Sequence, residues 1–407
     1  MDNERKEYQA GVQARISGAK MTALAMAAPL ESGPSSTKQT VLPPAETKKT
    51  EVKRTNQKLG LLTALLAVGA LRPGLSILTK FPWLVDAHPE IADLIIRMLK
   101  LSISSLYDSS STITKDPGYT QPRPRYGPAG VVPPSPRKPV LTLIAPAPPC
   151  TATTDFVFFY PLWTKAVPIL RSVDEIEYAL EPLMRFVGLH IGRDPNFVTR
   201  LARVGRSHLN QAIPHDPKTM QPIKPEPDHP VRLFWFKILR LYLIPALTII
   251  RGNAVCTVEV WNMVRTYETT SRGQLYGEWK MMYKKHPELR VREVQADRES
   301  KDIMRRLSHK TIESLSGAVG KLAHSNPCIF FANAVNQIMA YDNLADVVIQ
   351  ALKYVTNMGF DVLAFVILDA LANPNKQRLK DDGVNISDWL QSLFALPSHR
   401  VLSLYMT

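Results

Sequence analysis

The feature that most constrains the fold is a pair of apolar helical faces within residues 344–371. Apolar residues recur at steps of three and four along the first face, which comprises Leu344, Val347, Val348, Ala351, Leu352 and Val355. The second face repeats this spacing with Phe360, Leu363, Ile367 and Leu371. Between them, Gly359 is a residue type that ends helices with a positive φ, and Pro374 disfavours helical backbone at Asn373. The stretch is therefore predicted to form two helices joined by a tight turn.

Two serines extend this pattern on either side. Ser325 is expected to cap a helix that carries Phe331, Val335 and Ile338, and Ser387 is expected to cap a short final helix. A succession of helices and tight turns is typical of an α-solenoid, although an ordinary helical bundle has the same periodicity. No alternating pattern indicates strands. The predicted fold is all-α, an α-solenoid-like array of helical hairpins with disordered basic and proline-rich linkers.

Prolines divide the chain into blocks. The 33 prolines are clustered, which predicts helical units separated by connectors without regular structure. The expected divisions are a disordered basic N-terminal segment at 1–55, a helical unit at 56–107, a proline-rich disordered loop at 108–150, a helical unit at 151–213, a proline-rich loop at 214–230, a helical solenoid domain at 231–394 and an atypical tail at 395–407.

Charge and cysteine content restrict the kinds of partner and the cellular compartment that are expected for this chain. The formal net charge is +14, which suits contact with nucleic acid or other polyanions, and equally suits a nuclear protein with basic linkers and no nucleic-acid site of its own. The cysteines Cys150, Cys256 and Cys328 are odd in number and far apart, so free thiols in a reducing compartment are expected. The charged first residues do not form a secretory signal.

Two apolar stretches have nearly the length of a membrane span. Leu59–Leu78 is interrupted by an arginine–proline pair, and Val231–Ile250 contains Lys237 and Arg240. A span needs about 20 nearly uncharged residues, and a charge at mid-bilayer costs several kcal/mol. Both stretches are therefore expected to be buried helices of a soluble protein.

No motif in the chain indicates catalysis. The segment from Gly317 to Leu322 resembles a phosphate-binding loop, but it has the wrong glycine spacing and lacks the hydroxyl residue after its lysine. His324 and Ser325 are adjacent, yet nothing nearby supplies the third member of a nucleophilic site. The histidines include no metal-binding spacing. We therefore expect no catalytic residue, no cofactor and no metal site, so the chain is not predicted to be an enzyme.

The basic stretch 272–310 is the candidate nucleic-acid surface. Aromatic residues near the cations would stack on unpaired bases. However, interleaved carboxylates are typical of an ordinary solvated helix, and Trp279 and Tyr283 are spaced as core residues, which makes that interpretation the preferred one. The candidate RNA-contacting or partner-contacting residues are Lys284, Lys285, Arg305 and Arg306.

A second basic cluster lies near the N-terminus. Short runs rich in lysine and arginine serve as nuclear import signals, and they also occur in solvated linkers. The candidate import residues are Lys48, Lys49, Lys53 and Arg54.

Several segments together resemble one known family, the large scaffold subunit of the THO complex, called THO complex subunit two. The segments keep their order and spacing: NQKLGLLTALLAVG (Asn56–Gly69), LYGEWK (Leu275–Lys280), GKLAHSNP (Gly320–Pro327), YDNL (Tyr341–Leu344), LKYVT (Leu352–Thr356), DVLAF (Asp361–Phe365), DALANPNKQRLKDD (Asp369–Asp382) and ISDWLQSL (Ile386–Leu393). Family members are longer in both directions, and residues 394–407 do not resemble their continuation. A fragment of a longer subunit is therefore expected.

The resemblance implies a function as well as a fold. It implies a non-enzymatic helical scaffold in the nucleus that organises the other THO complex subunits. It also implies that the scaffold positions a DEAD-box RNA-dependent ATPase of mRNA export on nascent messenger ribonucleoprotein, which couples transcription to mRNA processing and nuclear export. The alternative is a helical module that binds RNA directly through the basic 272–310 region.

Overall fold

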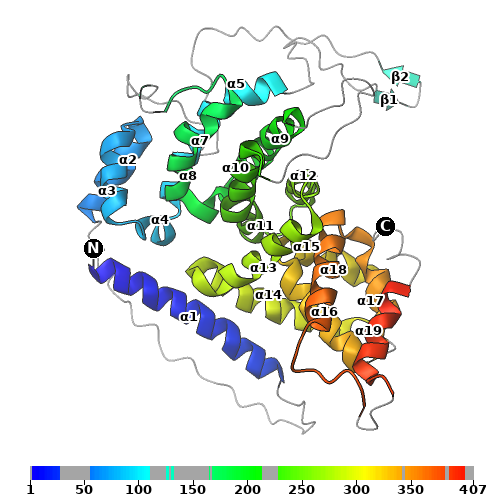
Figure 1. Ribbon diagram of the computed structural model, residues 1–407. Helices are drawn as coiled ribbons and strands as arrows, with labels where there is room; N and C mark the ends of the chain where they lie inside the picture. Colours follow the sequence, from blue (N-terminus) through cyan, green and yellow to red (C-terminus); the bar gives the residue numbers. More distant parts are fainter. Residues whose placement is uncertain are drawn as a thin grey trace.

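The helices follow one another across the molecule in sequence order, from α2 (Gln57–Val68) to α19 (Asp388–Ser398), in the computed structural model of Figure 1. The structure describes residues 2–27, 56–110, 125–127, 130–132, 165, 167–212, 228–341, 344–380 and 385–398. Buried side chains from Leu62 to Leu393 form one continuous apolar cluster along this array. The prediction of an all-α array of helices is confirmed.

The first block after the N-terminal segment begins at a capped helix. The Asn56 side chain accepts a hydrogen bond from the Lys58 backbone N–H at 3.0 Å, which fixes the start of α2. Gly69 ends α2 with a φ of 90°, a conformation that glycine adopts without a Cβ penalty. The block continues with α3 (Leu71–Lys80), α4 (Leu84–Ala87) and α5 (Glu90–Ser110).

The second block packs against α5 through a long helix. Its elements are η2 (Val173–Glu175), α7 (Ile176–Ala179), α8 (Glu181–Val187), η3 (Gly188–Arg193) and α9 (Pro195–Gln211). Asp194 caps α9, because its carboxylate accepts from the Phe197 N–H at 3.1 Å. Pro195 occupies the first helical position, where its missing N–H costs nothing.

A buried helix with an internal irregularity follows. It consists of α10 (Pro230–Ile238), a π-helical turn η4 (Leu239–Leu243) and α11 (Ile244–Ile250). The π turn directly precedes Pro245, whose ring cannot be accommodated by regular helical hydrogen bonding. By length and composition this helix is the one in the described part of the chain that could span a membrane, yet 61% of its apolar window is buried inside the protein. That burial agrees with the prediction of a core helix.

The remaining helices build the C-terminal half of the array. They are α12 (Ala254–Val264), α13 (Thr269–Lys285), α14 (Pro287–Arg306), α15 (Ile312–Ser325), α16 (Pro327–Ala340), α17 (Leu344–Ala351), η5 (Leu352–Tyr354) and α18 (Asn357–Leu371), and α19 completes the half. The predicted pair of helices within 344–371 is present, and the second ends at Leu371, before Asn373 and Pro374.

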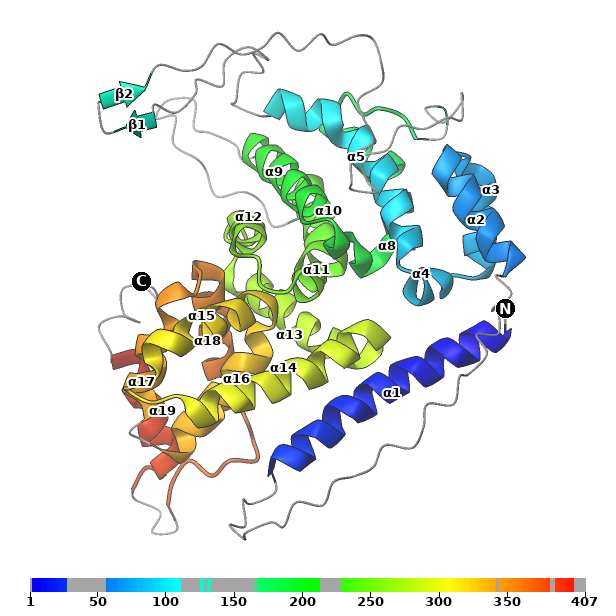
Figure 2. The same cartoon turned by 180° about the vertical axis from the view of Figure 1, so that it is seen from behind.

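The prediction that residues 1–55 are disordered is wrong for their first half. Residues Asp2–Ala27 form a long helix, α1, which runs beside α14 (Figure 2). Both oxygens of Glu288 on α14 accept hydrogen bonds from Arg15, each at 2.9 Å. The Asn56 amide donates to the Glu4 carboxylate at 2.5 Å. The sequence of α1 has no sustained apolar period, so its helix depends on these tertiary contacts and on helix-favouring alanines.

The proline-rich loop predicted at 108–150 also needs correction at two places. α5 continues to Ser110, and a short antiparallel hairpin pairs β1 (Arg125–Gly127) with β2 (Gly130–Val132). The rest of that loop lies outside the described residues, as do most of the loop predicted at 214–230 and the last nine residues of the tail predicted at 395–407.

Two predicted helix boundaries are wrong. Ser325 is the last residue of α15 instead of a cap for α16, and its hydroxyl donates to the Lys321 carbonyl at 3.2 Å. Gly359 lies in the first turn of α18 and does not end a helix. A Cβ atom at this position would collide with Val355, so glycine is required by close packing and not by a positive φ. Ser387 directly precedes α19, as predicted, but its buried hydroxyl makes no capping hydrogen bond.

Candidate functional site

The four predicted contact residues lie at two separate places. Lys284 and Lys285 are exposed at the C-terminal end of α13, close to the start of α14. Arg305 and Arg306 are exposed in the last turn of α14. α14 has 20 residues, and a rise of 1.5 Å per residue puts its ends about 30 Å apart. The structure therefore presents two basic pairs and not one patch.

Many charges on α14 are already paired. Arg306 donates to Asp302 at 2.9 Å, Lys301 lies 2.8 Å from Asp297, and Arg290 pairs with Glu293. Each exposed pair of this kind stabilises a helix by at most about 1 kcal/mol. The arrangement is that of a solvated helix with ion pairs along its surface, as the interleaved carboxylates indicate.

The aromatic residues of the basic stretch are core residues. Tyr276, Trp279 and Tyr283 are each 1% exposed, so they are not accessible for stacking on bases. The preferred interpretation of their spacing is confirmed. Any RNA contact in this region would depend on the cations alone. The candidate import residues Lys48, Lys49, Lys53 and Arg54 lie outside the described residues.

A buried network of uncharged polar side chains joins four helices, and we call it the neutral junction. The Trp279 indole N–H donates to the Thr248 hydroxyl at 3.1 Å, and that hydroxyl is 3.1 Å from the Tyr283 hydroxyl. Tyr283 donates to Asn326 Oδ1 at 3.0 Å, and the Asn326 amide donates to Ser325 Oγ at 3.0 Å. All five side chains are buried, and their hydrogen bonds remove the cost of burying polar groups. The junction therefore fixes α11, α13, α15 and the start of α16 against one another.

The network gives no base–nucleophile pair. Burial raises the pKa of Tyr283 well above its usual value, so the phenol remains neutral. Ser325 donates to backbone carbonyls, and His324, whose pKa is lowered by burial, has a buried Nε2 without a hydrogen-bond partner. The two residues therefore do not form a base–nucleophile pair. Gly317 lies inside α15, so the phosphate-loop resemblance has no counterpart in the fold.

A second polar cluster, the charged junction, joins three other segments. Asp86 on α4 lies 2.7 Å from His190 Nε2 on η3 and 3.4 Å from His286 Nε2, between α13 and α14. Burial disfavours the charged carboxylate, but the hydrogen bonds from His190 and His286 outweigh burial and hold the pKa of Asp86 well below its usual range. Tyr8 of α1 lies close by, and its pKa is raised by burial and by the charges of Asp86 and Glu288.

Metal and thiol chemistry receive no support from the described residues. No group of three or more histidine, cysteine, aspartate or glutamate side chains among them is arranged to hold a metal ion. Cys256 and Cys328 are free and buried, and burial raises their pKa values to about 11 and about 12. Thiols with such pKa values are largely unreactive at neutral pH. Cys150 lies outside the described residues.

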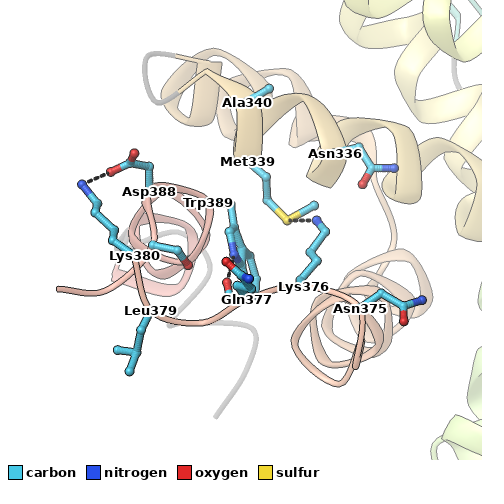
Figure 3. A pocket seen from close by; sticks show the side chains of 11 residues that line it. Asn336, Met339, Ala340, Asn375, Lys376, Gln377, Leu379, Lys380, Asp388 and Trp389 are labelled. Atoms are coloured by element: carbon cyan, nitrogen blue, oxygen red, sulfur yellow. Dashed lines mark hydrogen bonds and ion pairs between the residues drawn. The ribbon is translucent and has the colours of Figure 1, made fainter. Parts of the chain in front are cut away.

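A groove near the C-terminus is lined by α16 and by two of the segments that carry the family resemblance, Asp369–Asp382 and Ile386–Leu393 (Figure 3). Its volume is about 810 Å³, and it lies between α16 and the loop that leads into α19. The Trp389 indole donates to the Gln377 carbonyl at 2.8 Å, and the Lys376 ammonium lies 5.0 Å from the centre of the Trp389 ring. Lys376 is also 3.2 Å from the Met339 sulfur. Trp389 therefore holds the loop against α19, and Lys376 links the loop to Met339 of α16.

A second hollow shares a wall with this groove. It has a volume of about 550 Å³, and Asn336 of α16 lines both. Lys301 and Arg305 of α14 line its other side. The predicted contact residue Arg305 therefore lies beside the C-terminal groove, whereas Lys284 and Lys285 lie at the other end of α14.

Sequence reasoning missed the central residues of both junctions. Thr248 lies in an otherwise apolar run, and a single hydroxyl there gives no local signal. Asn326 precedes a proline, which marked a helix boundary but not a hydrogen-bonded partner. Asp86, His190 and His286 are about 100 residues apart in sequence at each step, so only the fold brings them together.

The fold and these sites define a helical-array protein whose buried polar clusters join helices. Two family models match nearly the whole chain: one described as THO complex subunit 2 N-terminus matches residues 1–316, and one described as transcription- and export-related complex subunit matches residues 319–394. The chain belongs to the THO complex subunit 2 family.

Relatives from distant organisms are similar to this chain. THO complex subunit 2 of Homo sapiens is 31% identical over 340 residues, which cover 83% of this chain and 19% of the relative. The Arabidopsis thaliana protein is 36% identical over 169 residues, covering 42% of this chain and 9% of the relative. The Saccharomyces cerevisiae protein is 28% identical over 243 residues, which cover 59% of this chain and 14% of the relative. The chain thus spans about a fifth or less of the length of these relatives.

Proposed function

We propose that this chain is a scaffold element of a nuclear THO complex, which it joins through protein contacts and without catalysing a reaction. The observation that carries this proposal is the match of two family models, which together extend from residue 1 to residue 394. The relatives are named as subunits of that complex. In this proposal the partners are the other THO complex subunits and a DEAD-box RNA-dependent ATPase of mRNA export, and the activity is the coupling of transcription to mRNA processing and export.

The structure supports a scaffold in two ways. The neutral junction and the continuous apolar core hold successive helices in fixed relation, which a platform for several partners requires. Large apolar side chains also remain at the surface, where they suit protein contacts. Examples are Val255 on α12, 58% exposed, and Leu368 on α18, 60% exposed.

An affinity purification tests this proposal. The full chain is used as bait in nuclear extract, with and without ribonuclease, and bound proteins are identified by mass spectrometry. Recovery of the other THO complex subunits despite ribonuclease is expected. Recovery of none of them under either condition would contradict the scaffold role. A bait with Val255→Asp and Leu368→Asp tests these exposed side chains as contacts and is expected to recover less of the other subunits, whereas Arg72→Asp and Lys80→Asp on α3 serve as the surface control.

Direct RNA binding is the second candidate function. It is favoured by the exposure of Lys284, Lys285 and Arg305, which form no ion pair with any carboxylate in the described part of the chain. Contacts to phosphates release counterions, so affinity should fall steeply with salt. The test reverses Lys284, Lys285, Arg305 and Arg306 to glutamate and measures oligouridylate affinity over a salt series. A variant with Arg72→Glu and Lys80→Glu on α3 is the control. Unchanged affinity and salt slope in the first variant would exclude this surface.

Nuclear import through Lys48, Lys49, Lys53 and Arg54 is part of the same proposal. Basic clusters of this length act as import signals. Alanine replacement of the four residues in a fluorescent fusion is expected to shift the protein out of the nucleus. Unchanged nuclear fluorescence would remove this cluster from the proposal.

A further inference from the structure

A small pocket above the neutral junction gathers three cations that the proposed scaffold role does not use. Its volume is about 250 Å³, and it lies between the end of α11, the middle of α14 and the end of α15. Arg251, Arg292 and Lys321 line it, one from each of these places. We call this site the cationic pocket.

None of the three cations forms an ion pair with a carboxylate in the part of the chain that the structure describes, although Glu299 also lines the pocket. Arg251 and Lys321 are exposed and form no ion pair within the described part of the chain. Arg292 is half-buried, its Nη1 donates to the neutral Gln295 at 3.0 Å, and its Nε is buried without any hydrogen-bond partner. Burial, and then the charge of Arg251, lower the pKa of Arg292, while the charge of Glu288 raises it. The half-buried guanidinium with its unpaired Nε is the group that a bound anion would stabilise most.

The backbone around the pocket is strained and closely packed. Arg251 has a φ of 58°, and it is the one non-glycine residue with a positive φ in the described part of the chain. Such a conformation costs about 1 kcal/mol or more and persists where the surroundings enforce it. At the next residue, Gly252, a Cβ atom would come within 2.7 Å of the Lys321 carbonyl oxygen. The turn therefore rests directly on α15, which holds Arg251 beside Lys321.

The base of the pocket is polar and fixed. Ser325 and Asn326 of the neutral junction line it. Hydrogen bonds beneath the pocket keep both side chains in place. A preorganised site of this kind loses little entropy on binding.

The size and lining of the pocket distinguish between anions. Binding of single-stranded RNA uses a long basic groove with aromatic stacking surfaces, but no aromatic side chain lines this pocket. Glu299 also lines the pocket from α14, so its carboxylate offsets one of the three positive charges. The remaining excess of two positive charges in a pocket of about 250 Å³ matches a compact group with two negative charges, and clusters of arginine recognise phosphorylated side chains in this way. We propose that the cationic pocket binds a phosphorylated serine or threonine side chain of a partner protein.

A binding experiment on the full chain tests this site independently of complex assembly. A fluorescein-labelled peptide with phosphoserine between glycine and alanine residues is titrated to millimolar concentration, and polarisation is measured. The same peptide with serine, and an oligouridylate, are titrated in parallel. The phosphopeptide is expected to bind, and the serine peptide to bind at least about tenfold more weakly. Equal binding of the two peptides, or no binding of the phosphopeptide, would overturn the proposal.

Substitutions locate the binding. Lys321→Gln and Arg251→Gln are each expected to weaken phosphopeptide binding by about tenfold or more, since each removes a charged donor. Arg72→Gln and Lys80→Gln on α3 remove the same charges from an exposed place elsewhere and should leave binding unchanged. Unfolding midpoints of all variants are compared to confirm the fold. If Lys321→Gln and Arg251→Gln bind like the parent, or if they weaken oligouridylate binding and not phosphopeptide binding, the assignment is wrong.

Discussion

The neutral junction and the charged junction do the same structural task with opposite chemistry. Each joins helices that are distant in sequence, and each is largely enclosed by apolar neighbours. In the neutral junction, Thr248, Tyr283 and Asn326 satisfy one another without any ionised group. In the charged junction, Asp86 remains ionised because His190 and His286 lie against it.

Their positions explain the difference. The neutral junction lies among α11, α13, α15 and α16, where an ion would lose its hydration with little compensation. The charged junction lies where α4, η3 and the α13–α14 turn meet α1, and the Asp86 side chain keeps 25% exposure. Partial exposure reduces the cost of a charge. The comparison predicts that the neutral junction contributes more to the free energy of unfolding than the charged junction does. It also predicts that only the contribution of the charged junction changes in acid.

The largest effect is expected from Trp279→Ala. The side chain is 1% exposed and donates to Thr248, so its removal leaves a cavity and removes one of the hydrogen bonds of the Thr248 hydroxyl. The free energy of unfolding should fall by about 3–5 kcal/mol, measured by urea denaturation. Met281→Ala on the same helix is the control, since Met281 is 63% exposed and its removal should cost less than about 0.5 kcal/mol. An equal loss of unfolding free energy in both variants would contradict the large contribution that is expected from the neutral junction.

Asp86→Asn is expected to have the next largest effect. Hydrogen bonds to a charged group contribute about 1.5–3 kcal/mol, so the variant should lose about that much stability at neutral pH. The pKa of Asp86 is lower in the folded state than its ordinary value of 3.8, so the folded state binds fewer protons there. This contribution is therefore present above about pH 4 and is lost as the pH falls towards the folded-state pKa.

Denaturation of Asp86→Asn and the parent protein over a pH series checks this expectation. The difference between them should shrink as the pH falls below about 4. Glu177→Gln removes one exposed carboxylate of equal charge and serves as the control. A difference that does not shrink there would contradict the ionised state of Asp86.

Tyr283→Phe should lower the free energy of unfolding by about 1–2 kcal/mol. Asn326 Oδ1 loses its donor in this variant, whereas the Thr248 hydroxyl keeps other partners. This loss should not vary with pH. Burial raises the pKa of Tyr283 above the ordinary value of 10.0, so the folded state holds the proton more tightly, and its contribution is complete below pH 10 and declines only above it. Denaturation at about pH 6 and about pH 8 tests the point, and a clear difference between the two would mean that a charged group takes part.

The smallest effect is expected from Arg15→Ala at the edge of the charged junction. The Arg15 side chain is 47% exposed, so its ion pair with Glu288 should contribute at most about 1 kcal/mol. The result should be faster hydrogen exchange in α1 with little change elsewhere, and added salt should reduce the difference. Arg5→Ala, an exposed arginine on the same helix, provides the comparison. Equal exchange in both variants would show that the ion pair does not hold α1.

Local pattern predicted most helices of the array. Periodicity and prolines placed the pair within 344–371, and the apolar run ending at Ile250 proved to be a core helix. The predictions that failed concern features that are determined by contacts between residues distant in sequence. α1 was missed because alanine gives propensity but no apolar face, and its docking residues, such as Arg15, meet partners far along the chain. Gly359 and Ser325 were misplaced because packing, not a turn or a cap, determines their roles.

The candidate sites were less predictable than the fold. Spacing identified Trp279 and Tyr283 as core residues, but not the hydrogen bonds that they make. The exposed cations were recognisable as a group, yet the sequence did not show that α14 separates them by its own length. Lys321 was examined as part of a phosphate loop, whereas the structure places it beside Arg251 and Arg292 through three different helices.

The π-helical turn before Pro245 behaves as a one-residue insertion in an otherwise regular helix. Each residue of an α-helix rotates the chain by about 100°, so the extra residue changes which side faces inward beyond it. Upstream, Trp235 and Ile238 point into the core, and downstream Thr248 reaches Trp279 and Tyr283. Deleting one residue from Leu239–Leu243 would restore a regular helix and turn Thr248 away from its partners. The length of this short segment thus sets the angular register between the two halves of the array.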